Sequence, residues 1–229
     1  MRLDRAVVLA AGLGTRLKWL TRHRPKALVE VADQPMIAHV LRQLVSQGVR
    51  DVAVNTHYHA DQLVRALGDG SRFGLRIHIS HEEVLLNSGG GVATALSMLP
   101  GSGLFAVHNV DVLADVDLSR LAKHCPAGGG CLALVENPSH HPQGDFNLSG
   151  HRVVRTGKKA HQYTYAGVAV FDALAFESYA PKDAFALLPV LQDLIDRELL
   201  FGVVHKGAWL DIGRPHDLIR ARRLTGGSG

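Results

Sequence analysis

The stretch Val-Val-Leu-Ala-Ala-Gly-Leu-Gly-Thr-Arg, residues 7–16, decides the fold class of this chain. Its apolar first half is too short for the core of a signal sequence and is typical of a buried first strand. Gly12 and Gly14 follow at once, as they do where a buried strand passes into a glycine-rich turn. Because backbone amides in such a turn can approach a phosphate chain closely, the stretch predicts an α/β fold with an anion-binding first loop.

The rest of the chain alternates between strand and helix patterns. Apolar residues recur at helical spacing over residues 36–45, and they alternate as in a strand over residues 75–79. We expect further strands at 49–54, 104–108, 131–135, 163–171 and 201–204, and further helices at 60–67, 90–99, 118–124, 185–199 and 215–223. This alternation predicts a Rossmann-like, doubly wound, mostly parallel sheet.

One segment departs from the alternation. Residues 145–148 and 152–155 flank the turn Ser149-Gly150 as the two arms of a hairpin do, so we expect a small β-hairpin insertion beside the sheet. No polar linker marks a domain boundary. We therefore expect a single domain over residues 1–225, followed by a flexible tail, 226–229.

Composition and cysteine content limit the class of protein. The 229 residues are 46% hydrophobic and 20% charged, enough to bury one substantial core. No stretch approaches the roughly 18 consecutive apolar residues of a membrane span. Cys125 and Cys131 are the two cysteines, and they do not suggest a disulfide-dense secreted scaffold. We expect a cytoplasmic protein with no membrane partner.

Positive charge is concentrated near the first loop. The net charge is +4, and no acidic residue lies between Asp4 and Glu30. A basic run can bind nucleic acid, but such a surface also needs aromatic side chains for stacking, and Trp19 is the one aromatic residue in the run 16–26. We expect phosphorylated small molecules, and no nucleic acid, as partners.

The full loop motif is more specific than its two glycines. Gly12-Leu-Gly-Thr-Arg16, followed by Leu20-Thr21 and Pro25-Lys26, resembles the signature of the sugar-1-phosphate nucleotidyltransferases. The resemblance extends over almost the whole chain. It is strongest to bacterial N-acetylmuramic acid α-1-phosphate uridylyltransferases, and mannose-1-phosphate guanylyltransferases are similar too. The chain departs from the usual family pattern at Lys18-Trp19, where Arg-Pro is common.

This resemblance implies a fold and a reaction. The fold would be that of the nucleotide-diphospho-sugar transferases. A nucleoside triphosphate, with UTP favoured, would be joined to a sugar 1-phosphate, with N-acetylmuramic acid 1-phosphate favoured, to give an NDP-sugar and pyrophosphate, as in peptidoglycan recycling. Catalysis would consist mainly of positioning and charge neutralisation. Arg16 and Lys26 would be the catalytic cations, holding the triphosphate. The implied nucleotide-binding residues are Ala10, Ala11, Gly12, Gly14, Thr15, Arg16, Lys26 and Glu82.

Two aspartates are candidate metal ligands. Asp111 follows the expected strand 104–108, at the edge where open α/β sheets bind ligands, and Asn109-Val110-Asp111 resembles the Asn-Gly-Asp metal motif of the family. Asp211 lies in a Trp-x-Asp-x-Gly segment whose aspartate completes the Mg2+ site in the family. Either residue alone could cap a turn or a helix. Together, two carboxylates and substrate phosphate oxygens suit Mg2+.

The sugar-phosphate site is the least constrained by the sequence. Asn87-Ser-Gly-Gly-Gly91 precedes an expected helix, and its glycines would let the sugar or nucleotide approach the backbone, unless the stretch is only a flexible loop. Lys158 lies where many relatives place a lysine for the sugar phosphate, although a solvated loop is an equal alternative. The implied sugar-phosphate-binding residues are Asn87, Gly89, Gly90, Asn109, Asp145, Asn147 and Lys158.

Three other functions compete with this one. A zinc site has no support, because the histidines are scattered and lack a cysteine or His-Glu-x-x-His context. A regulatory domain that binds nucleotide without turnover is a further hypothesis, against which the four residues Arg16, Lys26, Asp111 and Asp211 argue. A mannose-1-phosphate guanylyltransferase is the alternative within the enzyme class. Nothing in the sequence fixes the oligomeric state, and we expect a monomer.

Overall fold

The computed structural model describes residues 3–155 and 162–225. The strands are β1 (Arg5–Leu9), β2 (Glu30–Val31), β3 (Gln34–Pro35), β4 (Asp51–Thr56), β5 (Arg76–His81), β6 (Leu104–Asn109), β7 (Val112–Ala114), β8 (Gly130–Glu136), β9 (Asn147–Ser149), β10 (Arg152–Val154), β11 (Tyr163–Asp172), β12 (Leu200–Val204) and β13 (Trp209–Asp211). The α-helices are α1 (Met36–Ser46), α2 (Ala60–Leu67), α3 (Asn87–Leu96), α4 (Leu118–His124), α5 (Leu187–Asp196) and α6 (Pro215–Thr225), and the 3-10 helices are η1 (Thr15–Thr21), η2 (Lys26–Leu28), η3 (Ser71–Phe73) and η4 (Ala173–Phe176).

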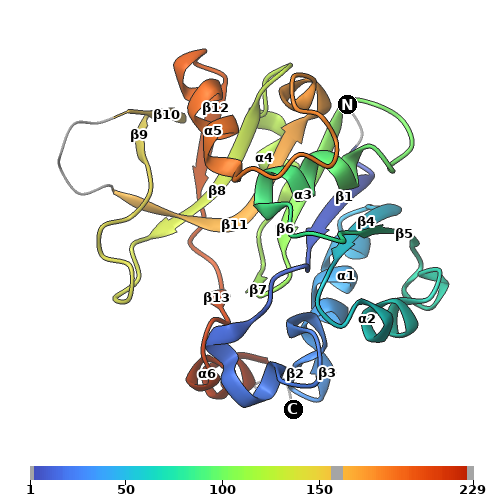
Figure 1. The fold of residues 1–229 in the computed structure, drawn as a ribbon. Helices are drawn as coiled ribbons and strands as arrows, with labels where there is room; N and C mark the ends of the chain where they lie inside the picture. Colours follow the sequence, from blue (N-terminus) through green and yellow to red (C-terminus); the bar gives the residue numbers. More distant parts are fainter. Residues whose placement is uncertain (1–2, 156–161, 226–229) are drawn as a thin grey trace.

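A nine-stranded sheet runs through the described part of the chain (Figure 1). Its strand order is β5-β4-β1-β6-β11-β8-β12-β10-β9. Strands β5, β4, β1 and β6 are parallel neighbours, and β8 is parallel to β12. β11 is antiparallel to both β6 and β8 and so joins two parallel groups that point the same way. The predicted mostly parallel, doubly wound sheet is confirmed.

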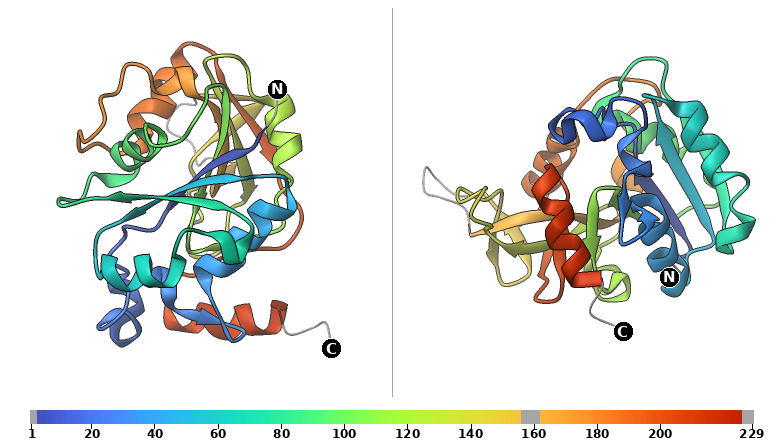
Figure 2. Two further views of the ribbon diagram at one scale, coloured as in Figure 1. Left: turned by 90° about the vertical axis from the view of Figure 1, so that its right-hand side faces the viewer. Right: turned by 90° about the horizontal axis from the view of Figure 1, so that it is seen from below.

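Helices cover both faces of the sheet, because successive strand residues point to opposite sides (Figure 2). Ala6 and Val8 of β1 pack in a core with apolar residues of α1, α2 and α4. Val7, between them, packs in a second core with residues of α3 and α5. The side chains of Ala6, Val7 and Val8 are all fully buried, so β1 lies between the two cores at the centre of the molecule.

The chain reverses its direction of winding at β1. From β1 it moves outward through β4 to β5, and then returns to place β6 on the other side of β1. In open α/β sheets, a crevice forms at the carboxyl ends of the strands at such a point. The loops after β1 and β6 therefore mark the expected position of a ligand site.

A smaller third core lies below this edge of the sheet. Leu17 of η1, Val31 of β2 and Leu218 of α6 are among its members. It packs the last helix against the loop that follows the first strand, as Figures 1 and 2 show. Within the residues that the structure describes, no helix is both long and apolar enough to cross a bilayer.

The expected β-hairpin insertion is present as β9 and β10, and it extends the edge of the sheet, since Arg152 of β10 pairs with Phe201 of β12. One sequence expectation about an element was wrong. Helix α3 begins at Asn87 and not at Gly90, so the three glycines form part of its first turns. The glycines are buried there against another segment of the chain, and that packing outweighs their poor helix propensity.

Candidate active site

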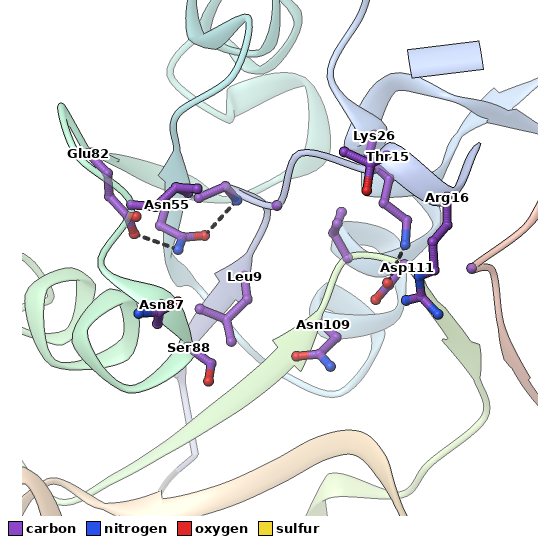
Figure 3. A pocket seen from close by; sticks show the side chains of 16 residues that line it. Leu9, Thr15, Arg16, Lys26, Asn55, Glu82, Asn87, Ser88, Asn109 and Asp111 are labelled. Carbon is purple, nitrogen blue, oxygen red and sulfur yellow. Dashed lines mark hydrogen bonds and ion pairs between the residues drawn. The ribbon is translucent and has the colours of Figure 1, made fainter. Parts of the chain in front are cut away.

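Two adjoining cavities open at the carboxyl edge of the sheet. The first has a volume of about 380 Å³, and its wall comes from the end of β4, from the loops after β1, β5 and β6 and from the start of α3 (Figure 3). The second has a volume of about 450 Å³ and is lined by the loop 139–141, by β11 and β13 and by the start of α6. The residues that line both cavities are Arg16, Asn109, Asp111 and Gly213. The two cavities therefore meet at a junction made by these four residues.

The glycine-rich loop forms the rim of the first cavity. Gly14 has a φ of 64°, and a Cβ there would come within 2.9 Å of Thr21 Cγ2 and 3.0 Å of Lys26 Cβ. The Thr21 hydroxyl donates to the Gly14 carbonyl at 2.9 Å, which fixes the turn. Gly12 and Thr15 line the same cavity, and the space beside Gly12 is open. The loop thus presents backbone to the cavity, as the sequence predicts for an anion-binding loop.

Asn55, at the end of β4, holds the start of this loop (Figure 3). Its side-chain oxygen accepts hydrogen bonds from the backbone amides of Ala10 at 2.5 Å and Ala11 at 3.2 Å. Its amide nitrogen donates to Glu82 Oε1 at 2.8 Å, and Glu82 Oε2 accepts from the Leu86 amide at 3.0 Å. Asn55 and Glu82 are 3% and 2% exposed, yet both line the cavity. The two alanine amides are thus engaged by protein, and Glu82 supports the loop through Asn55.

Lys26 and Asp111 form an ion pair on the opposite wall (Figure 3). Pro25 begins η2 in extended conformation and directs Lys26 inward, so that the residue is only 7% exposed. Asp111 follows β6, as the sequence predicts, and lies in the junction between the cavities. A buried lysine beside a carboxylate can be shared with a phosphate oxygen, because the ammonium group has three donors.

Asp211, from near the other end of the chain, lines the second cavity close to this junction. Strand β13 pairs with β7 so that Asp211 lies opposite Val112, and the amide of Ile212 donates to the carbonyl of Asp111 at 2.9 Å. Burial, and then the negative charge of Asp111, raise the pKa of Asp211 above its ordinary value. This mutual repulsion is the electrostatic environment in which a divalent cation is favoured.

The donor set fits Mg2+. Within residues 3–155 and 162–225, no group of three or more His, Cys, Asp or Glu side chains gathers to hold a metal ion. Mg2+ is usually bound by one or two carboxylates together with substrate phosphates, so the Asp111 and Asp211 pair meets this requirement. The carboxylates would supply the protein ligands, and phosphate oxygens would supply others.

Arg16 lies at the junction beside the C-terminal strand. A Cβ on Gly213 would come within 3.2 Å of Arg16 Nη1, so the glycine makes room for the guanidinium. The side chain lines both cavities (Figure 3). Arg16 can therefore bind an anion in either cavity.

Some of the residues that the sequence predicts to bind the sugar phosphate line the cavities, and others do not. Asn87 and Asn109 line the first cavity, and Asn109 also lines the second. Gly89 and Gly90 line neither, because the amides of both donate to the Phe185 carbonyl at 3.0 Å. A Cβ on Gly89 would meet the Phe185 ring at 2.5 Å. The close approach that these glycines allow is therefore to a neighbouring protein segment.

Asp145 and Asn147 also have internal partners. Asp145 Oδ2 accepts from the Tyr165 amide at 2.8 Å, and its other oxygen lies 2.9 Å from His141 Nε2. Asn147 is 6% exposed and accepts from the Gln162 amide at 2.9 Å. Neither residue lines either cavity, and both fasten the hairpin to β11. Lys158 lies outside the described residues.

Several lining residues were missed by the sequence analysis. Asn55 follows a buried strand just as Asn109 does, so the rule that selected Asn109 could have found it. Arg214, His216 and Arg220 line the second cavity from the start of α6. The sequence carries no signal for these three, because only the third core brings α6 beneath the sheet.

The sequence matches a known family over most of its length. Residues 5–226 match the family described as Nucleotidyl transferase. The chain is 36% identical to the N-acetylmuramate alpha-1-phosphate uridylyltransferase of Neisseria meningitidis, with 97% of this chain and 98% of that protein covered. It is 38% identical to the enzyme of the same name from Caulobacter vibrioides, with 94% of each chain covered. A mannose-1-phosphate guanylyltransferase catalytic subunit beta from Drosophila melanogaster is 30% identical, and 61% of its length is covered.

Solved structures share the fold. HddC from Yersinia pseudotuberculosis superposes with a TM-score of 0.79 at 24% identity, with 97% of this chain and all of that chain covered. A Bacillus anthracis protein crystallised with sucrose gives a TM-score of 0.86 at 20% identity, with 100% and 97% covered. At these identities the superpositions establish the architecture alone.

Proposed function

Because the chain belongs to the nucleotidyl transferase family, we propose that it joins UTP to N-acetylmuramic acid α-1-phosphate, giving the UDP-sugar and pyrophosphate. The chain is a sugar-1-phosphate nucleotidyltransferase. The choice of UTP and of the muramic sugar rests on the two relatives that share 36% and 38% of its residues over nearly their whole lengths.

The observation that carries the proposal is the junction between the two cavities. A transfer between two phosphorylated substrates needs one pocket for each, with the phosphates meeting where they open into one another. Arg16, Asn109 and Asp111 lie at that meeting point. The first cavity has the glycine-rich loop and suits the nucleotide, which leaves the second cavity for the sugar phosphate.

The reaction is an in-line displacement at the α-phosphorus of the triphosphate. An oxygen of the sugar 1-phosphate forms the new P–O bond, the bond to the β-phosphate breaks, and pyrophosphate leaves with that electron pair. Arg16 and Lys26 bind the oxygens on which negative charge increases. Asp111 and Asp211 would hold Mg2+, whose charge reduces the repulsion between the two approaching anions. The walls align the substrates, and no protein nucleophile takes part.

One alternative is favoured by a specific observation, and a second is opposed by one. The Drosophila relative suggests a mannose-1-phosphate guanylyltransferase, although the chain covers only 61% of its length. A regulatory domain without turnover would need nucleotide binding alone, and the Asp111 and Asp211 pair near the junction argues for catalysis.

We also propose that the enzyme is a cytoplasmic, single-domain monomer that acts in peptidoglycan recycling. The free thiols of Cys125 and Cys131 and the nucleoside triphosphate substrate support a reducing compartment.

Pyrophosphate release tests the proposed function. UTP, GTP, CTP and dTTP are each assayed with Mg2+ against the 1-phosphates of N-acetylmuramic acid, N-acetylglucosamine, glucose and mannose. We expect the greatest kcat/KM with UTP and the muramic sugar. A higher kcat/KM for another pair would replace the substrates, and the absence of release from folded protein that still binds nucleotide would favour the regulatory function.

A further inference from the structure

Two arginines lie at the end of the second cavity that α6 forms, beyond the junction. Arg214 and Arg220 line this end together with His216 and Asp217. His216 and Arg220 are four residues apart on a helix, so their side chains lie on the same side. Leu218 and Ala221, on the opposite side of α6, are buried in the third core. The side with His216 and Arg220 therefore faces the cavity.

Arg220 has no internal partner for its charge. Its guanidinium makes no ion pair or hydrogen bond with any residue in the described ranges. Asp217, three residues earlier, is already engaged: its Oδ2 accepts from the amides of Gly213 at 3.1 Å and Arg214 at 2.7 Å, and Oδ1 lies 3.1 Å from His216 Nε2. An exposed guanidinium in a substrate cavity is then available to an anion of the substrate.

The position of Arg220 separates it from the reacting phosphates. Arg16 lines both cavities, whereas Arg220 lines only the second. The helical rise places Arg220 about 7.5 Å along α6 from Pro215, beyond the junction residue Gly213. A sugar whose 1-phosphate lies at the junction would direct its opposite side towards Arg220.

We infer that Arg220 is a specificity-determining residue that binds a carboxylate on the sugar ring of the second substrate. This inference rests on the proposed function, because N-acetylmuramic acid carries such a carboxylate in its lactyl ether and N-acetylglucosamine is the same sugar without that group. The planar guanidinium can donate two parallel hydrogen bonds to one carboxylate. The two sugar 1-phosphates therefore form a matched pair that isolates this contact.

The test compares kcat/KM for the two sugar 1-phosphates, with UTP and Mg2+, in the wild type, Arg220→Gln and Arg220→Lys. Arg220→Gln should lower kcat/KM for the muramic substrate about 10- to 100-fold, mainly through KM, and that for the glucosamine substrate less than about 3-fold. Arg220→Lys keeps the charge but loses the paired donors, so an intermediate loss is expected. Where glucosamine turnover is too slow to measure, its inhibition constant against the muramic substrate replaces kcat/KM.

Arg42→Gln is the matched control. Arg42 is exposed on α1 and lines neither cavity, so its loss removes the same charge from another face. It should leave both substrates unchanged. Equal losses for both substrates in Arg220→Gln, at an unchanged melting temperature, or no loss for either, would overturn the inference. A wild type that uses neither sugar but accepts another 1-phosphate would instead refute the proposed sugar, before any variant is made.

Discussion

The side chain of Asn55 joins three segments that are far apart in the sequence. It accepts from Ala10 and Ala11 in the first loop, and it donates to Glu82 after β5. All of these groups are buried or nearly so, and a buried polar group that loses its partner costs about 1–3 kcal/mol of stability. We therefore assign Asn55 and Glu82 the task of positioning the loop that lines the first cavity.

A charge exchange between these two residues tests that assignment. Asn55→Asp should reduce the free energy of unfolding at pH 7.5 by about 3 kcal/mol, because it places two carboxylates against each other in a buried site. The deficit should shrink at pH 5, since a carboxyl group whose folded-state pKa is raised contributes most at low pH and loses that contribution as the pH rises. Urea unfolding at the two pH values measures both effects.

The reciprocal variant provides the control. In the double variant Asn55→Asp/Glu82→Gln, the amide introduced at position 82 can donate to the carboxylate introduced at position 55 and can accept from the Leu86 amide, so every buried group regains a partner. The double variant should recover to within about 1 kcal/mol of the wild type, and its KM for UTP should recover with it. A double variant no more stable than Asn55→Asp would show that the pair does not interact as the structure describes.

His108 makes the stability of the protein depend on pH. Burial lowers its pKa to about 4, from an ordinary value of 6.5. Its Nδ1 donates to the Asn109 carbonyl at 2.8 Å, and within the described residues its buried Nε2 has no partner. Between about pH 6.5 and pH 4 the unfolded chain binds a proton that the folded chain does not, so stability falls as the pH falls.

The expected loss from His108 is about 2 kcal/mol in the free energy of unfolding between pH 7.5 and pH 5. His108→Asn keeps a donor near the position of Nδ1 but does not titrate, so it should lack that share of the loss. Urea unfolding of both proteins at the two pH values gives the difference, in which the titration of all other groups cancels. Identical pH dependence would mean that His108 has the same pKa in the folded and unfolded states, and that burial does not lower it.

At the scale of elements, the start of α3 illustrates how packing overrides local propensity. Asn87 has a positive φ of 59°, and the three glycines that follow form the first turns of the helix. A Cβ on Gly90 would lie 2.0 Å from the Asp183 carbonyl oxygen. The helix can therefore pack against residues 183–186 only because its first turns have no side chains.

Gly90→Ala should consequently destabilise the protein by about 2–3 kcal/mol, as overpacking of a close contact does. Helix propensity alone predicts the opposite sign, a gain of about 1 kcal/mol. Gly12→Ala is the matched control, because the space beside Gly12 is open and its folding cost should be small. Thermal unfolding of the two variants distinguishes the effects, and a stabilised Gly90→Ala would contradict the contact with Asp183.

The elements that the sequence could predict are those with a strong period or a strand-to-turn transition. Helices 60–67 and 118–124 agree with the structure residue for residue, because their apolar spacing and their ends are clear. The 3-10 helix η1 was not predicted, since Lys18 within it has φ 55° and ψ −119°, values that no local pattern favours for lysine. The position of the hairpin at the edge of the sheet was not predicted either, because it depends on the pairing of β10 with β12 through one residue pair.

The candidate site shows the same division between local and long-range signals. Arg16, Lys26 and Asp111 were selected from short motifs, and the structure brings all three to the wall of the first cavity, where Lys26 pairs with Asp111. Asp145 and Asn147 were selected by resemblance, and in the structure they accept hydrogen bonds from the backbone amides of Tyr165 and Gln162, so their role in binding the sugar phosphate stays a prediction. Arg220 carried no motif, because its place in the cavity comes from the packing of a helix that lies at the opposite end of the sequence from the first loop.

At the scale of the whole molecule, the site is closed by the two ends of the chain. Asp111 follows the central strand β6, whereas Asp211 comes from β13, a short strand that pairs only with β7 in the described part of the chain. The third core joins η1, which contains Arg16, to α6, which follows Asp211. The fold thus uses a separate layer of packing to bring two carboxylates and an arginine to one place.

This arrangement should make the metal-free protein less stable than it could be. Asp211→Asn removes a buried charge that lies near Asp111, so it should raise the free energy of unfolding in EDTA by about 1 kcal/mol. It should also abolish the increase in melting temperature on adding Mg2+ with UTP, and slow Mg2+-dependent pyrophosphate release at least about 100-fold. Asp196→Asn, which removes an exposed carboxylate paired with Arg155, should change none of these quantities. An Asp211→Asn enzyme that kept its Mg2+-dependent rate would show that Asp211 is not a metal ligand. Greater stability together with lost activity would show that the buried charge of Asp211 serves function at a cost in stability.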